Sequence, residues 1–135
     1  MTVSESAPSP EHQKLVGHLI KWMKAEGFEI RCANYDDYEA CAEVKNYIPD
    51  ARGYRSDVGL ICYGESKTEH DVDNEHSRQQ FKEFAHRFMK EGKSEGKQCP
   101  FYITIEQGTE AALKEVLSEL DLLEKPHVKW KSFEV

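Results

Sequence analysis

Three side chains in the middle of the chain are of types that could act together on a charged substrate. Glu65 and Lys67 follow an apolar run, and Asp50 precedes Glu65 with fourteen residues between them. Side chains alternate between the two faces of a strand, so Glu65 and Lys67 would share one face. A turn at 55–57 would let 51–54 pair with the later strand and bring Asp50 beside Glu65. Two carboxylates and an ammonium group would suit a hard divalent cation and a scissile phosphate.

Helical and strand patterns alternate before this segment. Ser9 and Pro10 are typical of an N-cap and a first helical position. The helix that they begin has an apolar stripe and ends at Gly27; the stripe is Leu15, Val16, Leu19, Ile20 and Met23. Residues 28–32 alternate like a strand, whereas 33–48 fit either a short helix or an extended excursion. The hairpin is expected over 50–68.

The same alternation continues after the hairpin. Ser77 and Gln80 have the spacing of a capping box, and the helix that they predict carries an apolar face made of Phe81, Phe84, Ala85, Phe88 and Met89. Residues 101–105 predict a buried strand. Thr109 then opens a third helix whose inward residues are expected to be Ala112, Leu113, Val116, Leu117, Leu120 and Leu123. Residues 128–135 predict an edge strand.

This order of elements predicts an α/β sandwich with a mixed sheet. With 135 residues, the chain is long enough for one domain. That domain is expected over 10–135, after a polar, proline-containing and mobile tail at 1–9.

The sequence resembles the PD-(D/E)xK nuclease superfamily. The matching residues are Pro49 and Asp50, then Glu65, Ser66 and Lys67. The element order is also similar to the αβββαβ core of that restriction-endonuclease-like fold, above all in small archaeal Holliday-junction resolvases. The resemblance covers about residues 11–106.

The resemblance implies a role for each matched residue. Asp50 and Glu65 would hold Mg²⁺ or Mn²⁺, with the Ser66 backbone carbonyl as a further ligand. Lys67 would orient the attacking water or neutralise the transition state. Gln79 or Gln80 would lie near that lysine, at the start of the next helix.

Two further sets of residues follow from the resemblance. Some members use an acid from the first helix, for which Glu11 is the candidate here, although His18 is nearer the expected register. Arg52 and Arg55 would contact the DNA backbone. The histidines outside 69–76, which are His12, His18, His86 and His127, show no pairing in the sequence.

Each of these residues also has a structural interpretation. Asp50 could simply begin a turn, Glu65 and Lys67 could form a solvated cross-strand pair, and Gln80 could only complete a helix cap. Arg52 and Arg55 could be plain surface residues. The segment 69–76 is rich in metal-ligand types, but it lacks the pattern of a calcium loop or zinc site and fits a solvated acidic loop.

The composition of the chain limits its possible functions less than the motif does. The formal net charge of −7 weighs against a nucleic-acid partner. However, basic residues outnumber acidic ones between 78 and 97, where they are Arg78, Lys82, Arg87, Lys90, Lys93 and Lys97. The four cysteines form no CxxC pair and are expected to be reduced. We expect a cytoplasmic protein, because neither a signal peptide nor a membrane-spanning run is evident.

The first functional hypothesis is therefore a metal-dependent DNA endonuclease that uses Mg²⁺ or Mn²⁺ and acts as a homodimer. The second is a catalytically inactive member of the same fold that serves as an interaction or assembly module. A third is a small-ligand sensor built on this fold.

Overall fold

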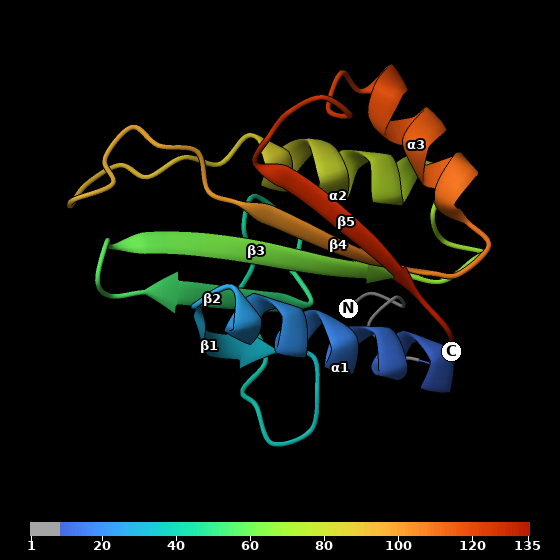
Figure 1. Ribbon diagram of the computed structural model, residues 1–135, viewed down its shortest axis with the longest axis horizontal. Coiled ribbons are helices and arrows are strands. Elements are labelled where there is room, and N and C mark those ends of the chain that lie inside the picture. Colours follow the sequence, from blue (N-terminus) through green and yellow to red (C-terminus); the bar gives the residue numbers. More distant parts are fainter. Residues whose placement is uncertain (1–8) are drawn as a thin grey trace.

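The computed structural model describes residues 9–135 as a five-stranded mixed sheet flanked by helices on both faces (Figure 1). The elements along the chain are α1 (Pro10–Ala25), β1 (Glu29–Ala33), β2 (Ala51–Arg55), β3 (Leu60–Lys67), α2 (Glu75–Ala85), β4 (Phe101–Glu106), α3 (Glu110–Glu119) and β5 (Val128–Phe133). The predicted α/β class and mixed sheet are confirmed. The predicted mobile tail falls almost entirely on residues 1–8, outside the described residues.

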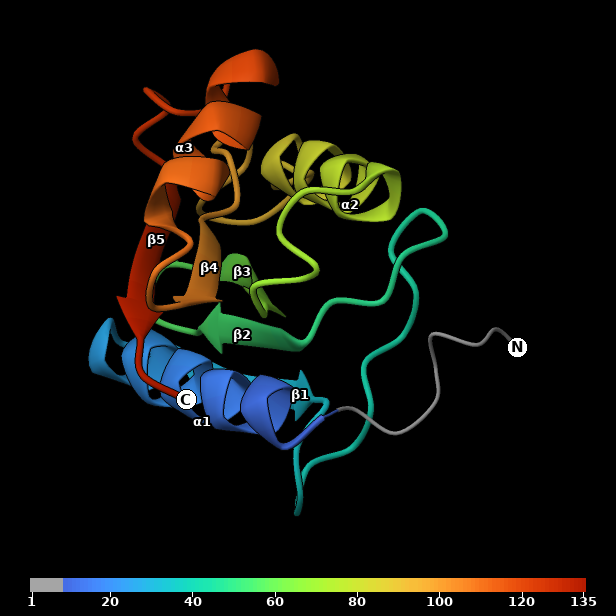
Figure 2. The same ribbon diagram turned by 90° about the vertical axis from the view of Figure 1, so that its right-hand side faces the viewer.

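The strands lie side by side in the order in which they occur in the chain. β1, β2 and β3 pair antiparallel, whereas β3, β4 and β5 pair parallel. α2 connects β3 to β4 and α3 connects β4 to β5, which parallel neighbours require. Both of these helices lie on one face of the sheet and α1 lies on the other (Figures 1 and 2).

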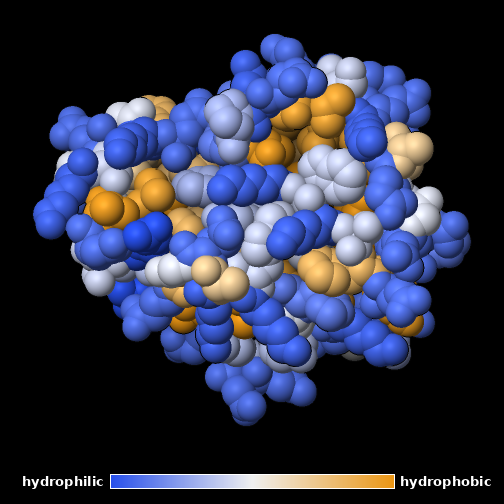
Figure 3. Space-filling view, in the orientation of Figure 1, coloured by the Kyte–Doolittle hydropathy of each residue, from blue (hydrophilic) through white to orange (hydrophobic). Residues whose placement is uncertain are grey.

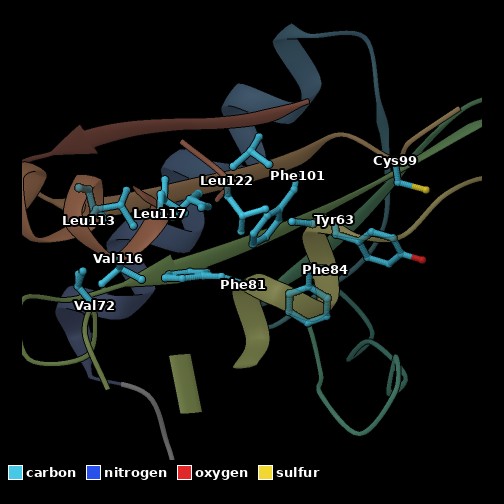
Figure 4. Close-up of a cluster of buried hydrophobic side chains, with 14 of the residues drawn as sticks. Tyr63, Val72, Phe81, Phe84, Cys99, Phe101, Leu113, Val116, Leu117 and Leu122 are labelled. Atoms are coloured by element: carbon cyan, nitrogen blue, oxygen red, sulfur yellow. The ribbon is translucent and has the colours of Figure 1, made fainter. Parts of the chain in front are cut away.

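A hydrophobic core fills each side of the sheet, whereas the surface seen in Figure 3 is mostly hydrophilic. Under α2 and α3, aromatic rings from α2 pack against aromatic rings from β3 and β4 (Figure 4). These side chains are Phe81 and Phe84 of α2, Tyr63 of β3 and Phe101 of β4. On the α1 side the core includes Leu19, Met23, Cys62 and Tyr102. The α2-side core takes side chains from β3, β4 and β5 but none from β1 or β2. One half of that sheet face therefore has no helix packed on it.

α1 begins and ends as the sequence predicts. The Ser9 side chain accepts a hydrogen bond from the His12 backbone N–H at 3.1 Å, and Pro10 is the first helical residue. Gly27 follows the helix with a positive φ of 99°, a conformation that glycine adopts without strain. All five residues of the predicted apolar stripe are buried.

α2 differs from its prediction at both ends. Its N-cap is Asn74, whose side chain accepts from the Ser77 backbone N–H, so the predicted capping box of Ser77 and Gln80 is wrong. The helix stops at Ala85, and Phe88 in the following loop is 53% exposed rather than part of the core. Capping by Asn74 starts the helix earlier, and this leaves Gln80 free to act elsewhere.

α3 and β4 are close to expectation. β4 is buried over almost its whole length, and Leu113, Val116 and Leu117 of α3 are fully buried. Ala112 is exposed, contrary to its prediction as an inward residue. Leu122, in the turn after the helix, is buried more deeply than Leu123.

The segment between β1 and β2 is irregular, apart from a tight turn. Lys45 and Asn46 both have positive φ, and the flanking Val44 and Tyr47 form an isolated bridge, as in a two-residue hairpin turn. Of the two predicted conformations, no short helix forms, and the extended excursion is the nearer description of the segment.

A disulfide joins Cys32 to Cys41, so the prediction that all four cysteines are reduced is wrong for this pair. Cys62 and Cys99 are free and buried, as expected. Disulfides persist mainly in oxidising compartments, which runs against the expectation of a cytoplasmic protein. Within residues 9–135, the helices are all too short or too polar to cross a membrane.

Two glycines on the α1 side provide a matched test of the packing. A Cβ at Gly64 would lie 2.8 Å from both Leu19 Cδ atoms, and Leu19 is fully buried. A Cβ at Gly17 would meet only the tip of Tyr35, an exposed side chain that can rotate away. We expect Gly64→Ala to lower the free energy of unfolding by about 1–3 kcal/mol. Gly17→Ala should raise it by up to about 1 kcal/mol, because alanine is the better helix former.

Urea denaturation of the two variants checks this expectation. Because the chemical change is the same at both sites, opposite signs would locate the effect in the contact with Leu19. A Gly64→Ala variant as stable as the wild type would contradict the tight approach of α1 to β3.

Candidate functional site

The β2–β3 hairpin brings the predicted residues together at one end of the sheet. Ala51 pairs with Gly64, so the residues one step beyond each, Asp50 and Glu65, become neighbours. Asp50, Glu65 and Lys67 are 6%, 3% and 7% exposed. Because Glu65 and Lys67 are almost fully buried, they cannot be the solvated cross-strand pair that was the alternative interpretation.

Reciprocal hydrogen bonds fix the two carboxylates. The Asp50 backbone N–H donates to Glu65 Oε1 at 3.2 Å, and the Ser66 backbone N–H donates to Asp50 Oδ2 at 2.9 Å. Each acid is thus oriented by the backbone of the strand that carries the other. Hydrogen bonds from backbone N–H groups to ionised carboxylates are among the stronger ones in proteins, so they help to fix both acids.

Lys67 completes the buried group. Its Nζ lies 3.3 Å from Glu65 Oε2 and donates a short hydrogen bond to Gln80 Oε1. Gln80 is buried on α2, which packs over the same face of the sheet. Gln79 instead donates to Glu75 on the helix surface. Of the two predicted glutamines, Gln80 is the one at the site.

His12 also belongs to this site, although the sequence showed no partner for it. Its Nε2 lies 3.1 Å from Asp50 Oδ2, and it reaches Asp50 from the first turn of α1. Its Nδ1 is buried and has no hydrogen-bond partner within the described part of the chain. The one sequence signal for His12 is its position in the first turn of the predicted helix, next to Glu11. The resemblance implies that a side chain from this end of the helix contributes to the site.

The loop after β1 supplies the last contact. The Asn34 side-chain amide donates to Asp50 Oδ1 at 3.4 Å, and the Asn34 backbone N–H donates to the Asp50 carbonyl at 2.8 Å. Asn34 lies between the two cysteines of the disulfide in the sequence. Sequence patterns contained nothing that marked it.

Ser66 joins the site to the opposite face of the sheet. Its hydroxyl lies 2.7 Å from the Thr104 hydroxyl on β4, which in turn donates to the Leu15 carbonyl on α1 at 3.2 Å. These bonds tie α1 to the sheet one turn after His12. They therefore help to hold His12 against Asp50.

Burial and neighbouring charges set the protonation of the acids and of His12. Burial raises the pKa of Glu65 to about 8, and the charge on Asp50 adds to this effect. Burial also opposes ionisation of Asp50, but hydrogen bonds from His12 and Ser66 together with nearby positive charge lower its pKa. For His12, burial is outweighed by the bond to Asp50 and by the two carboxylates, so its pKa is raised. Without a further cation, one acid is ionised and the other tends to hold a proton.

These shifts predict how stability depends on pH in the metal-free chain. The pKa of Glu65 rises from 4.5 when unfolded to about 8 when folded, so its contribution is complete below the unfolded value and is lost as pH rises through the folded one. His12 acts in the same direction above pH 6.5. Asp50 acts oppositely, but only near and below its ordinary value of 3.8.

We therefore expect the free energy of unfolding to fall between about pH 5 and about pH 8, by at most about 1.4 kcal/mol per pH unit for each proton. Urea denaturation in EDTA across this range measures the slope. Glu65→Gln removes the main titrating group and should flatten it, leaving the smaller part from His12. Equal slopes in wild type and variant would contradict the buried, proton-holding state of Glu65.

The remaining predicted residues lie elsewhere. Glu11 is exposed on the first turn of α1, and its neighbour His12 makes the contact with Asp50 instead. His18 stacks on Phe133 of β5. Arg52 and Arg55 lie three residues apart on β2 and therefore point to opposite faces. Arg55 is ion-paired with Asp57 at 2.8 Å, whereas Arg52 lies on the face that carries Glu65 and Lys67.

The acidic segment at 69–76 is largely used to build the start of α2. Asp71 accepts from the Thr68 hydroxyl, Asp73 pairs with Arg78, and Asn74 caps the helix. Among residues 9–135, no three histidine, cysteine or acidic side chains are grouped so that they could hold a metal by themselves. The structural interpretation of this segment is the better supported one.

Searches with family models, among curated proteins and among solved structures find no match to the chain.

Proposed function

We propose that this chain is a metal-dependent endonuclease that hydrolyses phosphodiester bonds in DNA and uses Mg²⁺ or Mn²⁺. The observation that carries the proposal is the buried group of Asp50, Glu65 and Lys67 at one end of the β2–β3 hairpin. Burying two acids together costs free energy unless a cation compensates them. Proteins keep such arrangements mainly at functional sites.

The donor set fits a hard divalent cation. Two ionised carboxylates offer about eight lone-pair positions, and protein groups use only five of them, three on Asp50 and two on Glu65. Free oxygen acceptors therefore remain on two buried carboxylates. Mg²⁺ is usually bound through only one or two protein carboxylates, with water and substrate phosphate as its other ligands. A group of three ligating side chains is thus not required.

When bound, the ion would lower the pKa of a water molecule and offset charge on the phosphate. Asp50 and Glu65 would hold the ion, with the Ser66 carbonyl as a further ligand. His12 keeps Asp50 ionised and oriented, as its hydrogen bond to Oδ2 indicates. It takes the place in α1 for which the resemblance suggested the acid Glu11.

Lys67 and Gln80 would act on the substrate side. The Lys67 ammonium can stabilise negative charge that develops on the phosphate, or orient the attacking water. Gln80 holds that ammonium in place through its side-chain oxygen. Both side chains are buried and fixed, so little reorganisation would be needed during the reaction.

The order of elements supports the same assignment. A helix, three strands, a helix and a strand run from α1 to β4, in the order of the restriction-endonuclease-like core. Asp50 precedes the second strand and Glu65 and Lys67 end the third, the positions at which the PD-(D/E)xK motif would place them. α3 and β5 would then be additions to this core.

Calorimetric titration with Mn²⁺ tests the central claim. We expect the wild-type chain to bind Mn²⁺ and Asp50→Asn to bind it at least about tenfold more weakly, because an acidic oxygen ligand is lost. Arg55→Ala is the matched control, since it changes a charge on the adjacent strand without touching the site. Equal binding by wild type and Asp50→Asn would remove the proposed ligand.

A plasmid-nicking assay with Mg²⁺ or Mn²⁺ then separates an enzyme from the alternative interaction module. The net charge of −7 is the observation that favours the module, because it weakens attraction to DNA. Metal binding without cleavage of any DNA form would support the module, whereas nicking that is lost in Asp50→Asn supports the endonuclease.

A further inference from the structure

A hollow lies on the sheet face that carries Glu65 and Lys67, over the half on which no helix packs. It has a volume of about 370 Å³ and is lined by Arg31, Arg52, Tyr54 and Ile61. This volume lies within the range of small-molecule binding sites. β1 and β2 add no side chain to the core beneath α2 and α3, which is why this half of the face stays open to solvent.

The position of these residues follows from the strand register. Arg52 pairs with Tyr63, and the next residue on the same face of β2 toward the site is Asp50. Strand residues two apart are separated by about 7 Å. The hollow therefore lies directly beside the proposed cleavage site, on the same face of the sheet.

A β-bulge brings the second arginine to the hollow. Ile30 pairs with Gly53 and Cys32 pairs with Arg52, so Arg31 is the extra residue between them. Bulges commonly re-aim a side chain near a functional site. Here the Arg31 guanidinium lies over the Tyr54 ring, 5.0 Å from its centroid.

The chemistry of the hollow is that of a nucleotide subsite. Tyrosine rings and guanidinium planes both stack on unpaired bases. The Arg31 guanidinium covers one face of the Tyr54 ring, so a base would stack on the guanidinium that Tyr54 supports or, once Arg31 moves aside, on the ring itself. The Arg52 guanidinium lies 6.0 Å from the centre of the Tyr63 ring, and no carboxylate within residues 9–135 pairs with it. Its charge is therefore available to an anion. Arg31 is paired with Glu29, but only at an exposed site.

We infer that the hollow formed by Arg31, Arg52, Tyr54 and Ile61 binds an unpaired nucleotide of a single-stranded nucleic acid next to the cleaved bond. Arg52 holds a phosphate, and Tyr54 with Arg31 stacks the base. In a duplex the faces of the bases are covered by their neighbours, so stacking on Tyr54 selects a single-stranded end, flap or branch. This inference deepens the proposed nuclease function and rests on it for the cleavage, but the binding can be measured alone.

The experiment measures binding of a short fluorescent oligothymidylate by anisotropy, in EDTA so that no cleavage occurs. We expect Tyr54→Leu to weaken binding about tenfold through lost stacking, and Tyr54→Phe, which keeps the ring, to bind like the wild type. Arg52→Ala should weaken binding and reduce the salt dependence by about one phosphate contact, a slope change of about 0.7. Arg55→Ala, on the same strand but the opposite face, should change neither quantity.

Thermal melts of each variant confirm that the chain is folded. Binding that is unchanged in both Tyr54→Leu and Arg52→Ala would overturn the inference, as would equal weakening by Arg55→Ala or a preference for blunt duplex of the same sequence. If the wild type binds the oligonucleotide through this hollow but never cleaves DNA, the inference stands and the proposed function fails. If the wild type cleaves DNA and the Tyr54→Leu and Arg52→Ala variants cleave it at the same rate, the proposed function stands and the inference fails.

Discussion

A Lys67→Ala variant is expected to cleave DNA about 100- to 1,000-fold more slowly than the wild-type chain, while binding Mn²⁺ at least as tightly. The two effects have the same cause. The buried ammonium lies 3.3 Å from Glu65 Oε2, where it would stabilise charge on the phosphate but also repel a cation held by the same carboxylate. Removing it therefore weakens catalysis without weakening the metal site.

Plasmid nicking under single-turnover conditions and Mn²⁺ calorimetry measure the two quantities on the same preparation. Lys82→Ala is the matched control, because Lys82 is an exposed lysine of α2 on the same helix as Gln80. Cleavage by Lys67→Ala at the wild-type rate would mean that the activity has another source. Loss of Mn²⁺ binding together with cleavage would mean that Lys67 maintains the site's structure rather than its chemistry.

The sequence predicted the hairpin site because all its determinants are local. Alternation along a strand places Glu65 and Lys67 on one face, and the short turn after Arg55 sets the register that brings Asp50 beside Glu65. Both features are contained in fewer than twenty consecutive residues. No knowledge of the rest of the fold was needed.

His12 and Asn34 were missed because their contacts depend on tertiary packing. His12 meets Asp50 across 38 residues of chain, and its approach depends on how α1 lies on the sheet. Asn34 belongs to an irregular loop whose path no periodic pattern describes. A single polar residue carries no periodicity of its own, so neither could be assigned before the helix and loop were placed.

Arg52 and Arg55 show the opposite case, because the strand pattern alone distinguishes them. Residues three apart on a strand must lie on opposite faces, so only one of the two could share the face of Glu65. The structure gives that place to Arg52 and pairs Arg55 with Asp57. The same alternation rule that located the acids could therefore have separated the two arginines.

The disulfide escaped prediction for a physical reason as well. Cys32 ends an apolar run that suits a buried thiol, and Cys41 lies in the segment whose pattern fits either a short helix or an extended excursion. Whether two cysteines nine residues apart can bond depends on how the chain between them folds back. The positive φ of Asp37 and the hydrogen bond from the Ala33 N–H to the Glu39 carbonyl provide that return.

Reduction of the Cys32–Cys41 disulfide is expected to lower the free energy of unfolding by about 3 kcal/mol, from the chain entropy of a loop of about ten residues. For a chain of this size, the midpoint of thermal unfolding should fall by roughly 10 °C. The closed loop carries Asn34, which donates two hydrogen bonds to Asp50. Reduction should therefore also weaken the two hydrogen bonds by which Asn34 holds Asp50 at the candidate site.

Thermal melts with and without reductant, on the wild type and on the double variant Cys32→Ser/Cys41→Ser, test this expectation. The wild type should lose stability on reduction, whereas the double variant should already be less stable and should not respond. A thiol count in denaturant provides the control, because only Cys62 and Cys99 should react before reduction and all four cysteines after it. Four reactive thiols in the unreduced wild type would contradict the disulfide, and a wild type whose midpoint ignores reductant would show that the bond contributes nothing to holding the loop at the site.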